Sequence, residues 1–286
     1  MGSTRREVLA RAGTLAGVAS ASAVTGCLGG RGDGAVSVLA AGSLQHALAT
    51  RFRERTDRRV TVETRGSAAC ARMVREGLRD PDLLALADPV LFDGLAAEYT
   101  AFATNALVVA YNPETAVGRA VASADVPLDP LFREDARLGR TDPDADPLGY
   151  RTLFAFGLAS ERWGRDDRSL LEPRQVFPET ELLAVLETGE IDAVIAYRNM
   201  AVDHGVPFES LPPAVDLSAP RFADRYGEYS YELPSGRVVR GAPITYGASL
   251  RTDGEAARAV FEQFVGGDWL GEGFEIPRPF PTVREL

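Results

Sequence analysis

The segment AVSVLAAGSLQHALATRF, residues 35–52, carries the fold prediction. Its first part is a short apolar strand, residues 36–39, which runs through small residues to Gly42 and Ser43. Apolar residues then recur at helical spacing, which predicts a helix with Ser43 as its N-cap. Free backbone N–H groups, a hydroxyl and the helix dipole meet at such a point and favour an anion. Ser43 is therefore a candidate anion-binding residue, although most serine caps only satisfy their own helix.

A second copy of this arrangement follows at Gly66 and Ser67. An alternating strand at residues 60–62 leads into the pair, and a helix with apolar positions follows it. Residues 83–87 then form a continuously apolar run, which is typical of a strand covered on both faces. Strands that alternate with helices predict an α/β fold with a parallel sheet, whose strand ends line a common crevice. We therefore expect Ser43 and Ser67 to face the same crevice.

Further strands and helices follow the apolar strand at residues 106–111, and residues 114–135 read as the passage into a second domain. The expected elements are a strand at 138–142, helices beginning near 147 and 180, a strand at 191–197, a hairpin around 234–236, a strand at 244–250 and a helix at 256–264. Asp146 stands just before the first of these helices, and Pro147 suits its first turn. Asp146 is thus either a helix cap or a ligand-binding residue. The nearby acidic residues lack the spacing of a calcium loop.

The first residues have the pattern of an export signal rather than of a folded element. Arg5 and Arg6 precede a run of small and apolar residues, and this run ends at Cys27 in a lipoprotein cleavage pattern. An ordinary N-terminal helix would not explain this order of features. We interpret residues 1–26 as a signal segment for twin-arginine export and Cys27 as the lipid attachment site. The glycine-rich residues 27–34 are then a flexible tether.

The composition excludes several classes of function. The formal charge is −10, all 31 basic residues are arginine and lysine is absent. An acidic, lysine-free chain argues against nucleic acid as a partner and suggests a salt-loving source. The missing lysine also excludes a P-loop and Schiff-base chemistry. Cys27 and Cys70 are the only cysteines, so lipid on Cys27 would leave no disulfide within the chain. No sequence motif calls for a cofactor.

An enzyme would need a nucleophile beside a base, and the chain offers few candidates. His46 and His204 are the only histidines, and no G-x-S-x-G motif surrounds Ser43 or Ser67. A secreted hydrolase built on Ser43, His46 and an aspartate stays open as an alternative at this point.

Several short motifs, taken in order, resemble those of archaeal molybdate/tungstate-binding proteins, the extracellular substrate-binding components of ABC transporters. The motifs are AAGSL at 40–44, GS at 66–67 with Cys70 and Arg72, LAD at 86–88, DPLGYR at 146–151, LETGEID at 186–192 and AVDH at 201–204. The resemblance covers nearly the whole chain after the signal segment. It implies a two-lobe periplasmic-binding-protein (type II) fold with a hinge. Lobe one would comprise residues 35–112 and 241–286, and lobe two residues 113–240.

The same resemblance implies which residues bind a tetrahedral oxyanion between the lobes. The residues are Ser43 and Ser67 from lobe one, and Asp146, the backbone around Leu148 and Gly149, and Tyr197 from lobe two. Asp146 would also contact the metal of the oxyanion. Family members often place a second carboxylate just before that tyrosine, but Ala196 stands there. We therefore predict a site with one carboxylate.

The expected function is capture of molybdate or tungstate for an ABC transporter permease. The protein would be a monomer without a cofactor, held on the extracellular face of the cell membrane only through its lipid. Sulfate, phosphate or another anion on the same scaffold is one alternative, and the serine hydrolase is the other. The sequence does not choose between molybdate and tungstate.

Overall fold

The computed structural model describes residues 34–133, 135–163 and 175–286. The predicted signal segment, Cys27 and all but the last residue of the predicted tether lie outside these residues. In the described ranges, no helix has both the length and the apolar character needed to span a membrane.

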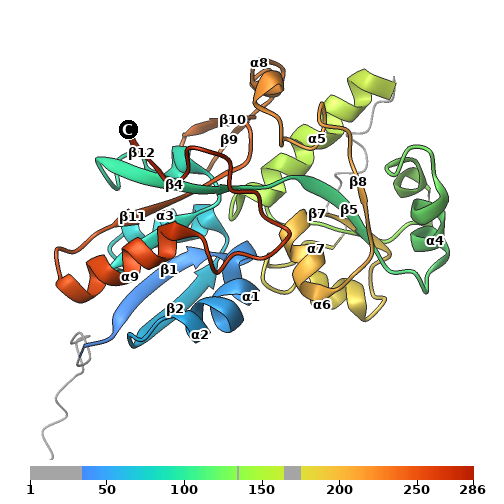
Figure 1. Cartoon of the computed structure of the whole chain (residues 1–286). Coiled ribbons are helices and arrows are strands. Elements are labelled where there is room, and N and C mark those ends of the chain that lie inside the picture. Colours follow the sequence, from blue (N-terminus) through green and yellow to red (C-terminus); the bar gives the residue numbers. More distant parts are fainter. Residues whose placement is uncertain (1–33, 134, 164–174) are drawn as a thin grey trace, which may run out of the picture. The chain divides into compact units, whose positions relative to one another are not determined.

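A mixed sheet of six strands forms the first lobe (Figure 1). In sheet order the strands are β12 (Thr282–Glu285), β4 (Glu98–Thr104), β11 (Thr245–Leu250), β3 (Leu83–Leu86), β1 (Val36–Ala41) and β2 (Val60–Arg65). β1 pairs in parallel with β2 and β3. β11 pairs antiparallel with β3 and β4, and β12 with β4. The predicted parallel sheet is thus confirmed for the first three strands, and the later strands add an antiparallel half.

Helical segments follow the parallel strands and pack on this sheet. They are η1 (Gly42–Leu44), α1 (Gln45–Ala47), the π-helical η2 (Leu48–Phe52), α2 (Arg53–Arg55), α3 (Ser67–Arg75), η3 (Pro89–Phe92) and, near the C-terminus, α9 (Glu255–Gly266). The prediction that Ser43 caps a helix is wrong. The 3-10 turn η1 begins directly after β1, its N-cap is Ala41, and no side chain caps it. Ser67 is the first residue of α3, as expected, with Gly66 as the N-cap.

The core of the first lobe is aromatic. Phe52 contacts Phe264 and Trp269 edge to face, with ring centroids 5.4 and 5.2 Å apart. Phe102 on β4 packs edge to face on Phe264 from the other side, at 5.4 Å. Because aromatic pairs of this geometry add to the gain from burial, they fix α9 and the helix after β1 against the sheet.

A smaller sheet of four strands forms the second lobe. Its order is β6 (Leu138–Gly139), β7 (Ala193–Tyr197), β5 (Leu107–Tyr111) and β8 (Phe208–Ser210). The elements around it are α4 (Ala116–Ser123), η4 (Asp129–Phe132), α5 (Pro147–Trp163), α6 (Leu182–Glu187), α7 (Arg198–His204), η6 (Pro220–Phe222) and α8 (Ala223–Tyr226). All residues of β5 and β7 are buried. The predicted hairpin is confirmed as β9 (Ser230–Glu232) and β10 (Val238–Arg240). It packs on α5 through Tyr231, whose ring stacks on that of Tyr150.

The chain crosses between the two sheets at residues 105–106, between β4 and β5, and returns between β8 and β11. The predicted lobe boundary at residue 112 would leave β5 in lobe one, whereas β5 pairs along its whole length with β7 in the second sheet. Below, lobe one means the six-stranded sheet with its helices. Lobe two means the four-stranded sheet with its helices and the β9–β10 hairpin.

Candidate ligand-binding site

Ser43 follows β1, and its side chain is buried at the junction of the lobes. Its Oγ accepts a hydrogen bond of 3.0 Å from the hydroxyl of Tyr246 on β11. Its carbonyl accepts another, of 2.7 Å, from Asn199 at the start of α7, and Asn199 is bonded in turn to Asn105 at the crossing. Because Tyr246 donates to Ser43, the Ser43 hydroxyl keeps its own proton for a further acceptor.

Ser67 is fully buried at the start of α3. Its Oγ accepts a hydrogen bond of 3.0 Å from the backbone N–H of Ala87, at the end of β3. The hydroxyl proton of Ser67 is therefore free to be donated elsewhere, as in Ser43. Both serines sit where neighbouring parallel strands end, so the expectation that they share one edge of the sheet is confirmed.

Asp146 caps α5. Its Oδ1 accepts hydrogen bonds from the backbone N–H groups of Leu148, at 2.6 Å, and Gly149, at 3.3 Å. These two amides were predicted to face the oxyanion, but they are directed at Asp146 in this structure. Burial raises the pKa of Asp146 to about 7, although the hydrogen bonds oppose the rise. Oδ1 of Asp146 is thus committed to capping α5.

Tyr197 ends β7 and is fully buried. Its hydroxyl accepts a hydrogen bond of 2.8 Å from Nη1 of Arg151 on α5. Burial raises the pKa of Tyr197, and the Arg151 charge opposes this rise. Tyr197 therefore stays protonated at neutral pH and, like the two serines, has a proton to donate.

Glu179 is a site residue that the sequence did not reveal. It precedes α6, is 4% exposed, and neither carboxylate oxygen has a hydrogen-bond partner in the described part of the chain. A β-carbon placed on Gly42 would lie 2.6 Å from Glu179 Oε2. The carboxylate thus lies against the turn that carries Ser43. Neighbouring Glu181 has the same charge and a similar position in the sequence, so only the three-dimensional structure distinguishes them.

Glu179 bears on the prediction of a site with one carboxylate, because its carboxylate lies against the turn that carries Ser43. Burial, followed by the charge of Asp146, raises the pKa of Glu179 well above its ordinary value, and the nearby Ser43 only partly offsets this. Ala196, the position expected to hold a second acid, lies within β7. A second buried carboxylate, that of Glu179, lies instead in the segment before α6. Among the described residues, no group of three or more His, Cys, Asp or Glu side chains could hold a metal ion by itself.

The two lobes touch through their main chains beside this cluster. The N–H of Ala69 on α3 donates to the carbonyl of Ala145 at 2.8 Å. A β-carbon on Gly66 would lie 2.3 Å from Cβ of Asp146 and 2.5 Å from that carbonyl oxygen. Only glycine allows the lobes to approach so closely at this point.

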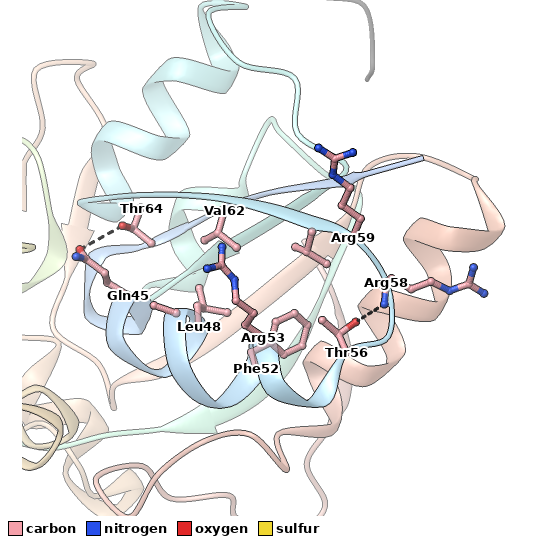
Figure 2. A pocket seen from close by; sticks show the side chains of 11 residues that line it. Gln45, Leu48, Phe52, Arg53, Thr56, Arg58, Arg59, Val62 and Thr64 are labelled. Carbon is pink, nitrogen blue, oxygen red and sulfur yellow. Dashed lines mark hydrogen bonds between the residues drawn. The ribbon is translucent and has the colours of Figure 1, made fainter. Parts of the chain in front are cut away.

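A hollow of about 210 Å³ at the lobe junction is lined by two of these residues, Ser43 and Glu179. Lobe one lines it with Gly42, Ser43 and His46, and lobe two with Glu179 and Met200, among others. A larger groove of about 580 Å³ lies elsewhere, between the helix after β1 and the edge strand β2 (Figure 2). It contains none of the predicted site residues. The convergence of buried polar groups, rather than volume, places the candidate site at the lobe junction.

The geometry does not assemble a hydrolytic triad. His46 packs near His204, with ring centroids 6.3 Å apart, and within the described residues no hydrogen bond joins either histidine to Ser43. The partners of the Ser43 side chain and carbonyl are Tyr246 and Asn199. Ser43 therefore lacks a general base.

Two sheets joined by two crossings around a polar cluster suit a solute-binding protein, and sequence comparison shows the family. Residues 36–268 match the family described as bacterial extracellular solute-binding protein. The chain belongs to this family. Its members bind solutes and are not enzymes, which excludes the hydrolase alternative.

Individual relatives confirm the predicted resemblance to archaeal molybdate/tungstate-binding proteins. A Haloferax volcanii protein, named provisionally as an ABC transporter molybdenum-binding protein, is 49% identical over 98% of this chain and 94% of its own. The molybdate/tungstate-binding protein WtpA of Pyrococcus abyssi is 26% identical over 84% of this chain and 83% of its own. The structure of the periplasmic molybdate-binding protein of Azotobacter vinelandii aligns with a TM-score of 0.59 at 14% identity, over 85% of this chain and 100% of the other. This last likeness confirms the two-lobe α/β fold.

Proposed function

We propose that this protein captures molybdate or tungstate between its lobes and delivers the ion to the permease of an ABC transporter. Ser43, Ser67 and Tyr197 donate hydrogen bonds to the oxygen atoms of the anion. Asp146 and Glu179 approach its metal. The names of the Haloferax and Pyrococcus relatives support this choice of ligand.

The observation that carries the proposal is the pair of buried carboxylates, one of which, Glu179, accepts no hydrogen bond of ordinary geometry from the described residues. Carboxylates repel a simple dianion such as sulfate, and an unpaired buried charge is costly. The metal of molybdate or tungstate can accept additional oxygen ligands, whereas the sulfur of sulfate cannot readily do so. The carboxylates of Asp146 and Glu179 would then become ligands instead of opposing charges, which favours molybdate and tungstate over sulfate or phosphate.

We further propose that the protein works as a monomer at the extracellular face of the cell membrane, after twin-arginine export and lipid attachment at Cys27. The order of features in residues 1–27 supports this, as does membership of an extracellular family. The acidic, lysine-free composition supports a salt-rich habitat.

Calorimetric titration of the protein with molybdate, tungstate, sulfate and phosphate tests the proposed ligand. We expect molybdate and tungstate to bind at least a hundredfold more tightly than the other two, a difference of about 2.7 kcal/mol. Equal affinity for sulfate would contradict the proposal. Labelling of the cells' lipoproteins, with a Cys27→Ser variant as control, tests the anchor.

A further inference from the structure

We propose that Arg151 is a positioning residue that couples closure of the lobes to the orientation of the Tyr197 hydroxyl, through a buried ion pair with Asp88 that crosses between the lobes. The inference rests on the proposed function, because it assigns a role at the same site. Arg151 was not among the predicted site residues.

Arg151 lies on α5 in lobe two and contacts both lobes at once. Its Nη1 donates to the hydroxyl of Tyr197 in lobe two and to the carbonyl of Ala87 in lobe one, each at 2.8 Å. Its Nη2 lies 3.3 Å from Oδ2 of Asp88. The hydroxyl of Tyr150, also from lobe two, donates to the same Oδ2 at 2.6 Å. Two consecutive residues of α5 therefore hold the end of β3.

The burial of this pair makes it sensitive to closure. The side chains of Arg151 and Asp88 are 4% and 10% exposed. A buried charge is tolerated only when it is paired and hydrogen-bonded. If the lobes separate, the two charges lose each other and water takes their place. The ion pair is therefore complete only when the lobes are together.

Ala87 extends the contact to the other predicted ligand-binding group. Its carbonyl accepts from Arg151, and its N–H donates to Oγ of Ser67. One peptide segment thus connects the serine of lobe one with the tyrosine of lobe two. The planar guanidinium is suited to this place because it can engage several acceptors in fixed directions, which an ammonium cannot do.

The molecule contains a matched control. Arg237 on the β9–β10 hairpin of lobe two contacts Asp93 of lobe one at 2.5 Å, and these side chains are 25% and 62% exposed. Asp88 and Asp93 flank the same short helix, η3, as its N-cap and C-cap. Because most of the Asp93 side chain is exposed to water here, the pair is expected to have little influence on closure.

The experiment measures molybdate affinity by calorimetry in the full chain and in the variants Asp88→Asn, Arg151→Lys and Asp93→Asn. We expect Asp88→Asn and Arg151→Lys to weaken binding about ten- to hundredfold and Asp93→Asn to change it less than twofold. Small-angle scattering should show a smaller ligand-induced compaction for the first two variants than for the third. Asn retains the ability to cap η3, and thermal unfolding checks that each variant is folded.

A double-mutant cycle separates positioning from a purely structural role. If Asp88 acts through Arg151 on the Tyr197 hydroxyl, Asp88→Asn should cost less in a Tyr197→Phe background than in the native chain. Additive losses would overturn the positioning role, as would equal effects of Asp88→Asn and Asp93→Asn. Should Asp88→Asn fail to fold, Arg151→Lys in the same cycle decides. Failure of the native chain to bind any of the four oxyanions would refute the proposed function instead, so the two failures are distinguishable.

Discussion

The small hollow at the lobe junction contains a buried polar group without a hydrogen-bond partner in the described residues, whereas the charged groups of the large groove beside β2 are exposed to water. The hollow, of about 210 Å³, is lined in part by Glu179. The carboxylate oxygens of Glu179 are buried and accept no hydrogen bond within the described residues. The groove, of about 580 Å³, is lined only by residues from positions 45–64 of lobe one. Its polar residues include Arg53, Arg58 and Arg59, which are exposed (Figure 2). A ligand relieves the cost of a buried, unpaired group but gains little by replacing water around an exposed one. Volume alone would point to the groove, whereas the buried oxygens of Glu179 point to the hollow.

The largest expected effect comes from removing the two buried carboxylates at the lobe junction, Glu179 and Asp146. We expect Glu179→Gln and Asp146→Asn each to weaken molybdate binding by about a hundredfold, because a charged ligand of the metal is lost. Sulfate binding should weaken much less or improve. Glu181→Gln is the control, since Glu181 is exposed two residues away. Calorimetry with both anions measures the difference. Equal losses for molybdate and sulfate would show that neither carboxylate contacts the metal.

The hydroxyl donors come next. Ser43→Ala and Ser67→Ala should each cost about 1.5–3 kcal/mol, or roughly ten- to more than hundredfold in oxyanion affinity, because each removes a hydrogen bond to a charged group. Ser123→Ala on the exposed surface of α4 should change nothing measurable. If both site variants stay folded and bind molybdate as the native chain does, the serines have only a structural role. The proposed binding site at the lobe junction is then contradicted.

The stability of the ligand-free protein should depend on pH in a way that the groove cannot produce. Burial raises the pKa of Asp146 to about 7 and that of Glu179 well above its ordinary value. From about pH 4 to 7 the folded state therefore binds more protons than the unfolded state. Stability is full below that range and falls as the pH rises through it. Denaturant unfolding between pH 4 and 8 measures the slope, which should be shallower in Glu179→Gln. A flat profile in the native chain would contradict the unpaired carboxylate.

The smallest expected effect concerns the groove itself. Arg53→Ala and Val62→Thr should leave molybdate affinity within twofold of the native value, because neither residue lies among the groups at the lobe junction. Stability should change by no more than about 0.5 kcal/mol, as for most exposed positions. A loss of affinity above fivefold would mean that the groove takes part in binding. This result would contradict the conclusion that only the hollow at the lobe junction binds the ligand.

Much of the first lobe could be predicted from sequence because its signals are local. The apolar strands β1 and β3 and the glycine–serine turns can be read directly from the residues. β4 could not, since EYTAFAT mixes alanine and threonine with exposed residues and its stability comes from neighbours on both sides. For a related reason the sequence places the lobe boundary at residue 112, after β5 instead of before it. β5 looks like any buried strand, and its pairing with β7 is a long-range choice.

Within the site, residue type could be predicted but not the direction of each group. Ser43, Ser67, Asp146 and Tyr197 do gather at the lobe junction, where each has a defined partner. The capping role that the sequence offers for Asp146 is confirmed by its hydrogen bonds from the amides of Leu148 and Gly149, and the same bonds turn these amides away from their predicted role toward an oxyanion. Glu179 was missed because burial decides its importance. Nothing in the sequence distinguishes it from the exposed Glu181.

Gly66 determines how closely the two lobes can approach each other. Main-chain atoms meet at the Ala69–Ala145 hydrogen bond, and a single methyl group on Gly66 would overlap Asp146. Because this contact is made by backbone atoms and by a residue without a side chain, it defines the closest approach of the two lobes at this point. If the lobes close on the proposed oxyanion, this contact limits the space left for it, and an ion larger than that space would keep the lobes apart. Because this contact is made by the backbone, side-chain substitutions around the site should change the affinity for the ion more easily than the size of the ion that is accepted.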